Sequence, residues 1–315
     1  MKLLKGRIYL ISSKTLKIIS RKPLFITIVL VSIFLNGFSK DIYKDSTPLS
    51  SQKQALYFLE NLKNIEQSIF WTEVKPQAFI KNLRDDILHP LDLYEGSFTN
   101  FCGYAALSYL PLVDDPKTYI NFMVKLYKEG RASYNTVRFS PSKEIMNAAG
   151  TLRFKGKLDI RPADQIWFLS LADHFKSYLN FFSHHYKPGA ENTFWASVSY
   201  GKFNRMIKSL FEYNVKARGS DLFHPGMVDL VSYIKASLKT GTTFLYLNNE
   251  FLLKKNDNLK PGIPTHYVVL LDLISEKNGS LTMTYWDYGF RSVRQLTPAF
   301  LKKIVFGVTT CSINH

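Results

Sequence analysis

The spacing of hydrophobic positions changes about two thirds of the way along the chain. Before residue 213, apolar side chains recur every three to four residues, the period of a helix with one buried face. This pattern predicts helices over 55–70, 76–88, 102–111, 116–129, 141–150, 162–182 and 194–212. The polar stretch 40–54 precedes them as a linker, and 91–101 is predicted to be a loop.

After residue 213 the hydrophobic runs are short and rich in β-branched and aromatic residues, which is typical of strands. We predict strands over 213–217, 242–249, 266–274, 280–288 and 304–313, with one more helix over 226–239. The tetrapeptide KNGS at 277–280 is a strong hairpin turn. Helices followed by hairpin-linked strands predict an α+β fold, a helical N-terminal part packed on a mostly antiparallel C-terminal sheet.

The first 39 residues are typical of an export segment. Residues 1–22 carry seven Lys and Arg and no acid, 24–35 are apolar, and small residues follow at Gly37 and Ser39. A signal peptide cleaved after Ser39 fits this order. An uncleaved anchor is the alternative, although the run is shorter than the roughly 20 residues of a spanning helix. Both interpretations predict an exported protein (periplasmic, secreted or anchored) that meets the membrane only through this segment.

The charge balance narrows the choice of partners. The chain has 41 Lys and Arg against 25 Asp and Glu, a formal net charge of +16. Such a surface favours an anionic partner, and for an exported protein an anionic cell-wall polymer is the natural one. The basic residues are spread along the chain and no nucleic-acid module motif occurs, so we expect no nucleic-acid partner. A basic protein with no charged partner is the alternative.

Three residues carry candidate chemistry. Cys102 opens the apolar run CGYAALSYL, and a thiol at a helix N-terminus is favoured as the reactive thiolate. His266 heads an apolar strand, and Asp287 lies in the aromatic run YWDYG, where a carboxylate needs a partner. The turn at 277–280 folds the two strands together, so we expect His266 and Asp287 to be neighbours. Such a set can serve as nucleophile, base and orienting group.

The order Cys, His, Asp resembles the papain-like cysteine peptidase superfamily, and more closely its bacteriocin-processing (double-glycine) peptidase branch. The segments that carry the resemblance are 96–110 and 262–313, including THYVV at 265–269 and WDYG at 286–289. After these, the resemblance indicates a polar stretch, a short helix at 296–303 and a last strand. Residues 112–260 exceed the minimal family core and are interpreted as a large helical insertion in a domain spanning 91–315, after linker and helices at 40–90.

The resemblance implies a thiol hydrolase of peptide or amide bonds, with Cys102 as nucleophile, His266 as base and Asp287 orienting the base. It implies no cofactor and no metal. The family places a Gln several residues before the Cys as an oxyanion donor, but Gly96 stands six residues before Cys102. Asn100 is our candidate for an amide donor in its place. Acyl transfer by the same triad is an open alternative, as is a non-catalytic binding or structural module.

The non-catalytic alternative would carry a Cys102–Cys311 disulfide, which an oxidising compartment permits. Other polar groups are weaker candidates. His184–His185, and His174 with Asp173, lack a third metal ligand at a helical offset, so no metal site is expected. Ser220 is not in the strand–turn–helix context of a serine nucleophile, and the aromatic residues Trp167, Trp195 and those of 178–200 are interpreted as core.

Overall fold

The computed structural model describes residues 50–62, 65–96, 99–153, 160–176, 185–249 and 263–313. All of them belong to one compact unit, Tyr43–His315. The predicted signal or anchor segment, 1–39, lies outside the described residues. Within the part of the chain that is described, no helix combines the length and apolar character needed to cross a membrane.

The described helices are mostly short and amphipathic. They are α2 (Gln52–Asn61), α3 (Pro76–Leu88), α4 (Cys102–Asp114), α5 (Pro116–Glu129), α6 (Lys143–Ala148), α7 (Pro162–His174), α8 (Tyr200–Leu210), α9 (Leu230–Thr240) and α11 (Pro298–Ile304), with a 3-10 turn at Ala190–Asn192. The strands are β1 (Ala132–Tyr134), β2 (Val137–Phe139), β3 (Tyr213–Gly219), β4 (Thr242–Leu247), β5 (His266–Ser275), β6 (Leu281–Asp287), β7 (Phe290–Leu296) and β8 (Val305–Ile313).

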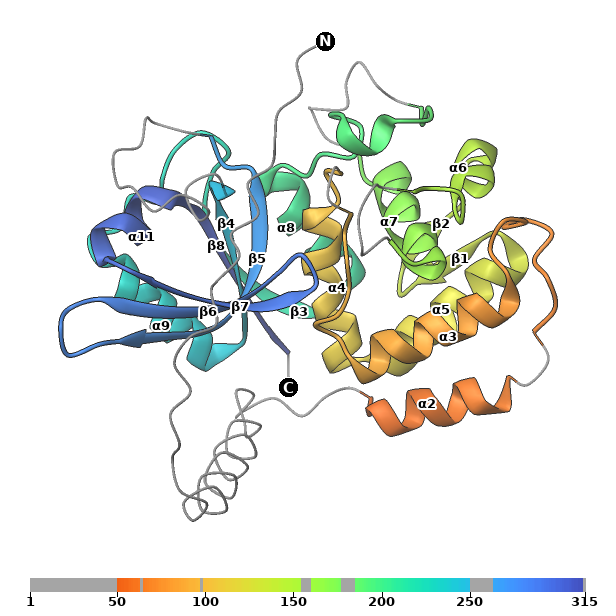
Figure 1. The fold of residues 1–315 in the computed structure, drawn as a ribbon, viewed down its shortest axis with the longest axis horizontal. Coiled ribbons are helices and arrows are strands. Elements are labelled where there is room, and N and C mark those ends of the chain that lie inside the picture. The colour runs from red at the N-terminus through yellow and green to blue at the C-terminus, as the bar shows by residue number, and fades with distance from the viewer. Residues whose placement is uncertain are drawn as a thin grey trace, which may run out of the picture. The chain divides into compact units, whose positions relative to one another are not determined.

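Six strands form one antiparallel sheet in the order β3-β8-β4-β5-β6-β7, and β1 and β2 form a separate hairpin. Figure 1 shows this sheet beside a group of helices made from the first half of the chain, with α4 between the two parts. The predicted α+β class and the mostly antiparallel sheet are confirmed. Helices come first and strands later, as the change in hydrophobic spacing predicts.

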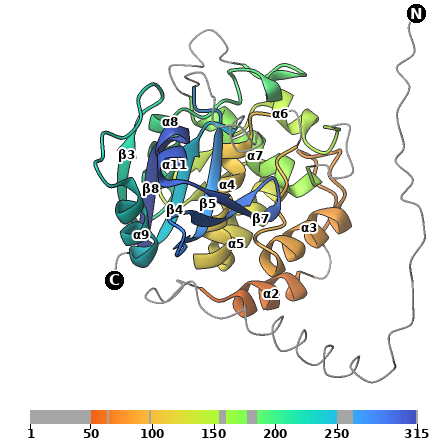
Figure 2. The same ribbon diagram turned by 60° about the vertical axis from the view of Figure 1, so that its left-hand side comes forward.

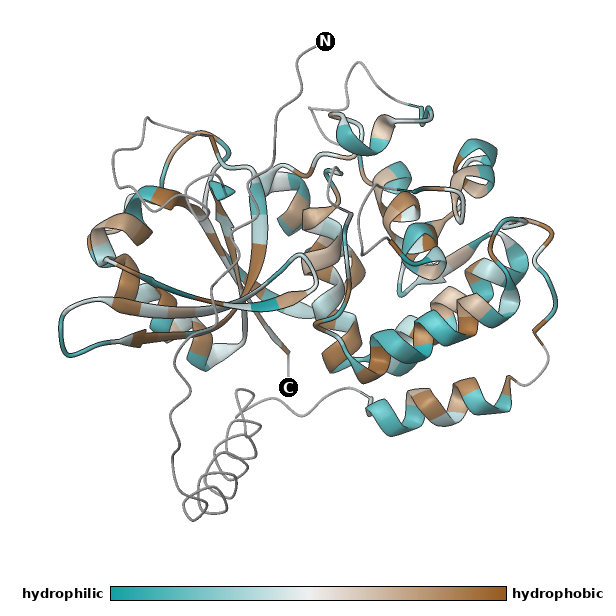
Figure 3. Cartoon of the chain, in the orientation of Figure 1, coloured by the Kyte–Doolittle hydropathy of each residue, from teal (hydrophilic) through white to brown (hydrophobic). Residues whose placement is uncertain are grey.

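Helices cover both faces of the sheet, so a hydrophobic core lies on each side of it. On one face, α4 and α8 pack against the sheet through side chains such as Tyr104, Phe203 and Tyr267. On the other, α9 and α11 pack on Leu245 and Val268. Figure 2 shows α9 and α11 on the side of the sheet away from α4, and Figure 3 shows apolar and polar positions alternating along the helices.

Several helix ends differ from the prediction, and their capping explains why. The helix predicted over 55–70 begins at Gln52, because Ser51 and Gln54 form a capping box, and it ends at Asn61. The helix predicted over 194–212 begins only at Tyr200, where the Ser199 side chain caps it. The helix at Cys102 runs past Pro111 to Asp114, since a proline near the end of a helix removes only one hydrogen bond.

One edge strand and one short hairpin were missed by the hydrophobic pattern. The segment interpreted as a polar stretch after Asp287 is the edge strand β7, most of whose residues are partly or fully exposed. An edge strand buries little, so it lacks the alternation that identifies an inner strand. The β1–β2 hairpin has only three residues a strand and turns at Asn135, whose φ is 49°.

Candidate active site

Cys102 is the first residue of α4, on the face of the helix that meets the sheet. Its side chain is half-buried, and the thiol lies 3.9 Å from the carbonyl oxygen of Thr265, the residue before β5. The following Gly103 lets the first helical turn approach Val198 closely. The local sequence therefore brings the thiol to the sheet without closing it off from solvent.

His266 and Asp287 lie at the same end of the sheet, at the start of β5 and the end of β6. The ring Nε2 of His266 and Oδ1 of Asp287 form a hydrogen bond. Both side chains are buried. The predicted neighbourhood of these two residues is thus present, across the hairpin that turns between Glu276 and Ser280.

A β-bulge in β5 decides that the two side chains can meet. Near the turn, Asp272 pairs with Thr284, but beyond the bulge Leu270 pairs with Tyr285. If the pairing of Asp272 with Thr284 continued without the bulge, Asp287 would pair with Val269. The side chain of Val269 points to the other face of the sheet from that of His266. The pairing of Leu270 with Tyr285 instead continues to place Asp287 beside Val268. Val268 is on the same face of the sheet as His266, because side chains alternate along a strand.

The contacts of His266 connect Asp287 to the thiol. Because Nε2 is bound to Asp287, the Nδ1 side of the ring is left for Cys102 and for Glu95, whose Oε1 lies 3.9 Å from Nδ1. Burial alone would lower the pKa of His266, but its hydrogen bonds with Asp287 and Cys102 outweigh that effect, and Glu95 adds to the rise once it is ionised. The net pKa is well above the ordinary value, which favours the imidazolium form beside the thiol.

Tyr288 covers the ring of His266. The two rings stack at a centroid distance of 4.6 Å, and Asn249 Nδ2 donates to the Tyr288 hydroxyl at 2.9 Å. The backbone N–H of Asn249 in turn donates to Thr265 Oγ1. Tyr288 adopts a φ of 49°, a conformation uncommon for a residue with a side chain, which turns its ring onto His266. This cover fixes the plane of the imidazole.

Glu95 is the site residue that no pattern in the sequence singled out. It lies seven positions before Cys102, in the predicted loop, and is only 1% exposed. Burial raises its pKa to about 8, although the His266 ring opposes the rise, and the charge of Asp287 adds to it. An acid between Tyr94 and Gly96 has no local pattern that marks it as buried, so only its contacts identify it.

Asn100 does not lie where the predicted oxyanion donor would have to be. Its side-chain amide donates to the carbonyl oxygen of Thr193 at 2.9 Å and to Ser197 Oγ at 3.1 Å. Both amide protons are therefore directed at the 193–197 loop. This residue connects the start of α4 to that loop, and the prediction of an oxyanion role for it is not supported by its geometry.

The disulfide of the alternative interpretation is not formed, because both cysteines are free. Cys311 is buried in β8, where it pairs in register with Val215 and Thr242. Burial raises its pKa well above the usual range of a thiol, so Cys311 is unreactive. Cys102 is thus the half-exposed thiol of the pair.

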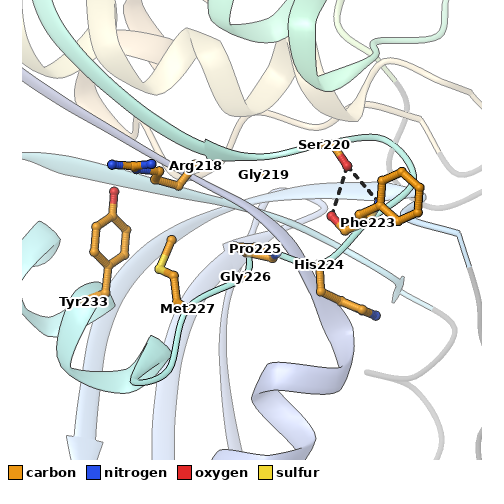
Figure 4. Close-up of a pocket in the computed structure, with 9 residues that line it drawn as sticks. All are labelled: Arg218, Gly219, Ser220, Phe223, His224, Pro225, Gly226, Met227 and Tyr233. Carbon is orange, nitrogen blue, oxygen red and sulfur yellow. Dashed lines mark hydrogen bonds between the residues drawn. The ribbon is translucent and has the colours of Figure 1, made fainter.

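Other candidates from the sequence are structural in this fold. Trp167 and Trp195 are fully buried core residues. Among the described residues, no three His, Cys, Asp or Glu side chains are arranged to hold a metal ion, and His184 lies outside them. Ser220 bonds the backbone of Phe223, in the wall of a cavity of about 510 Å³ that Figure 4 shows. None of the residues lining this cavity belongs to the Cys102 site.

Comparison with known proteins adds no relative to this picture: no family model, no curated protein and no solved structure matches the chain.

Proposed function

We propose that this chain is an exported thiol hydrolase on a papain-like frame, cleaving a peptide or other amide bond. The observation that carries the proposal is the position of His266, bound to Asp287 through Nε2 and open to Cys102 on its other side. A thiol at a helix N-terminus, a base within its reach and a carboxylate that orients the base are the parts that nucleophilic catalysis requires.

In the proposed mechanism the Cys102 sulfur attacks the carbonyl carbon, and the electron pair of the C=O bond moves onto oxygen. His266 holds the thiol proton as imidazolium and delivers it to the leaving nitrogen when the C–N bond breaks. Water, deprotonated by the same ring, then attacks the thioester, and the thiol regains a proton as the acid departs. Asp287 keeps Nε2 fixed, so that the proton exchanged with substrate is carried on the Nδ1 side.

The charge of the chain and its predicted export segment bear on the substrate class. The basic surface and the predicted export segment favour a cell-envelope protein or the anionic cell-wall polymer, peptidoglycan in particular, as the substrate or partner. Membrane contact would be restricted to residues 1–39. No nucleic-acid partner and no cofactor enter this proposal.

The test is selective alkylation followed by turnover. In the full chain, iodoacetamide at neutral pH should modify Cys102 at least about tenfold faster than a model thiol, because only the thiolate reacts. Cys311→Ala, which removes the buried thiol, is the matched control and should leave this rate unchanged. Cys102→Ala should abolish both labelling and hydrolysis of peptidoglycan or a casein reporter, with an unaltered circular dichroism spectrum. Hydrolysis that survives in Cys102→Ala would disprove the triad.

A further inference from the structure

The carboxyl of Glu95 has an unsatisfied oxygen inside the site. Its Oε1 faces Nδ1 of His266, whereas Oε2 is buried and has no hydrogen-bond partner. A buried polar atom without a partner costs about 1–3 kcal/mol, so such groups in a native structure need an explanation. A ligand atom that completes the hydrogen bonding of Oε2 is one.

The backbone holds this carboxyl close to the nucleophile. Thr99 Oγ1 donates to the carbonyl oxygen of Glu95 at 2.5 Å and accepts from the backbone N–H of Phe101 at 3.2 Å. Phe101 is the N-cap of α4, so one side chain links the Glu95 loop to the helix that begins with Cys102. Gly96, with a φ of +86°, permits the sharp bend between the two.

The thiol and the carboxyl face the same side of one imidazole. Because Asp287 occupies Nε2, the hydrogen bond of the ring with Cys102 and the approach of Glu95 both fall on the Nδ1 side. A carbonyl attacked by Cys102 would have its oxygen near the backbone N–H of Cys102. The first N–H groups of a helix lack an intrahelical acceptor, whereas that of Tyr104 already donates to the carbonyl oxygen of Phe101. The Glu95 carboxyl lies on the Nδ1 side of the same ring, and its Oε2 is the atom there that lacks a hydrogen-bond partner.

We propose that Glu95 is the oxyanion donor of this site, its carboxyl O–H hydrogen-bonding the oxygen that gains charge when Cys102 attacks. The assignment rests on the proposed thiol hydrolase. The C–S bond forms and the C=O π electrons move to oxygen. Glu95 keeps its proton throughout and shares it as a hydrogen bond. Its loop thereby supplies an acid where papain-like enzymes carry a glutamine amide.

The donor must be protonated, and its surroundings favour that state at neutral pH. The groups that interact with it are His266 from β5, Asp287 at the end of β6 and Tyr288 beyond it. Cys102 from α4 interacts with the same His266 ring. Burial and the nearby carboxylate raise the pKa of Glu95 to about 8 despite the attraction of the ring. The donor is therefore present below pH 8 and is lost as the pH rises through that value.

A pair of thiol probes separates this role from the nucleophile itself. Iodoacetamide alkylates the sulfur without forming an oxyanion. Acetyl-glycinal, a minimal peptide aldehyde, adds to Cys102 to give a tetrahedral hemithioacetal whose oxygen occupies the oxyanion position. In the full chain, Glu95→Ala should weaken aldehyde affinity by about 100-fold, the usual cost of one lost oxyanion donor. Its alkylation rate should change by less than about threefold, as expected for a thiolate left in place.

The conservative variant supplies the decisive control. Glu95→Gln, which keeps a donor that cannot ionise, should recover most of the lost affinity. It should also abolish the weakening of aldehyde binding that the wild type shows above pH 8. A neutral carboxyl band in the infrared difference spectrum of wild type minus Glu95→Gln at pH 6.5 reports the proton directly. Glu191→Gln, which alters a buried acid bonded to Tyr186, should change neither probe.

The assignment is overturned if Glu95→Gln binds the aldehyde no better than Glu95→Ala. It is equally overturned if the carboxyl band is absent at pH 6.5, or if wild type is alkylated yet forms no aldehyde adduct. A different result would contradict the proposed thiol hydrolase itself: Cys102 would be alkylated no faster than a model thiol in the wild type and in every variant.

Discussion

At the scale of single residues, the charge of Asp287 and the ring of His266 form the pair on which the proposed chemistry depends. Asp287 is buried and bound through Oδ1 to Nε2, so its carboxylate both orients the ring and stabilises the imidazolium. The stacked Tyr288 fixes the ring plane but supplies no charge. Asp287 therefore contributes both orientation and charge, and a substitution that keeps its hydrogen bond to the ring can remove the charge alone.

Asp287→Asn should lower the pKa of His266 while leaving the ring in place. The amide oxygen still accepts from Nε2, but a neutral acceptor stabilises the imidazolium less than the carboxylate whose hydrogen bond raises the pKa. The wild-type pKa is shifted upward, so the variant should lose its ring proton at a lower pH than the wild type. At a pH between the two pKa values, the wild type keeps the imidazolium and the variant does not. An NMR titration of the His266 ring protons measures this.

Asp272→Asn is the control for that titration, since Asp272 lies on the same hairpin but bonds the backbone of Leu273. It should leave the His266 titration unchanged. An equal downward shift in both variants would mean that the general charge of the hairpin, rather than the Asp287 contact, sets the pKa.

At the scale of elements, the first turn of α4 must approach its neighbours closely to bring Cys102 to the sheet. A Cβ built on Gly103 would lie 2.8 Å from Cβ of Val198, closer than two such atoms can pack. Gly201 in α8 offers the contrast, because a Cβ there meets no atom within 4 Å. Two glycines in neighbouring helices thus differ only in the space around them.

Gly103→Ala should reduce the free energy of unfolding by about 1–2 kcal/mol, because overpacking costs more than the gain in helix propensity. Gly201→Ala should raise it by up to about 1 kcal/mol, since only the unfolded chain loses freedom. Urea denaturation of both variants measures the difference. If Gly103→Ala were as stable as Gly201→Ala, the close packing of α4 on Val198 would be wrong.

At the scale of the whole molecule, the site is assembled from two parts that are far apart in sequence. The helical part supplies Cys102 and the loop with Glu95, and the sheet supplies His266 and Asp287. In the described part of the chain, Nε1 of Trp286 donates to the carbonyl oxygen of Leu91 at 2.7 Å and so joins the loop to the sheet directly. Trp286 precedes Asp287, and Leu91 lies in the loop that carries Glu95. This bond therefore helps to fix the position of Glu95 relative to Asp287.

Trp286→Phe should destabilise the protein by about 1–3 kcal/mol, because a carbonyl oxygen loses its donor. It should also weaken binding of the aldehyde probe, since the loop that carries Glu95 is released. Trp71→Phe is the matched control: its Nε1 donates to Leu126 at 2.8 Å entirely within the helical part. It should cost similar stability with no effect on aldehyde binding. Equal binding losses in both variants would contradict a specific role for the Trp286 bond.

Local patterns in the sequence were enough to predict much of this architecture. The helix predicted over 116–129 has those bounds in the structure, because Asp115 caps its start, Pro116 suits its first turn and Gly130 ends it in a left-handed conformation. The KNGS turn likewise predicted the β5–β6 hairpin. These signals involve residues close in sequence, so they do not depend on the rest of the chain.

The sequence by itself determined that Cys102 begins a buried helix, that His266 heads an apolar strand and that Asp287 lies on the next one. Only the tertiary structure decided how they meet. The bulge between Leu270 and Asp272 sets the face of Asp287, because one residue of register reverses every side chain. Packing of loops distant in sequence buries Glu95 beside His266 and turns the amide of Asn100 away to Thr193, since burial and partner choice depend on contacts that no local pattern records.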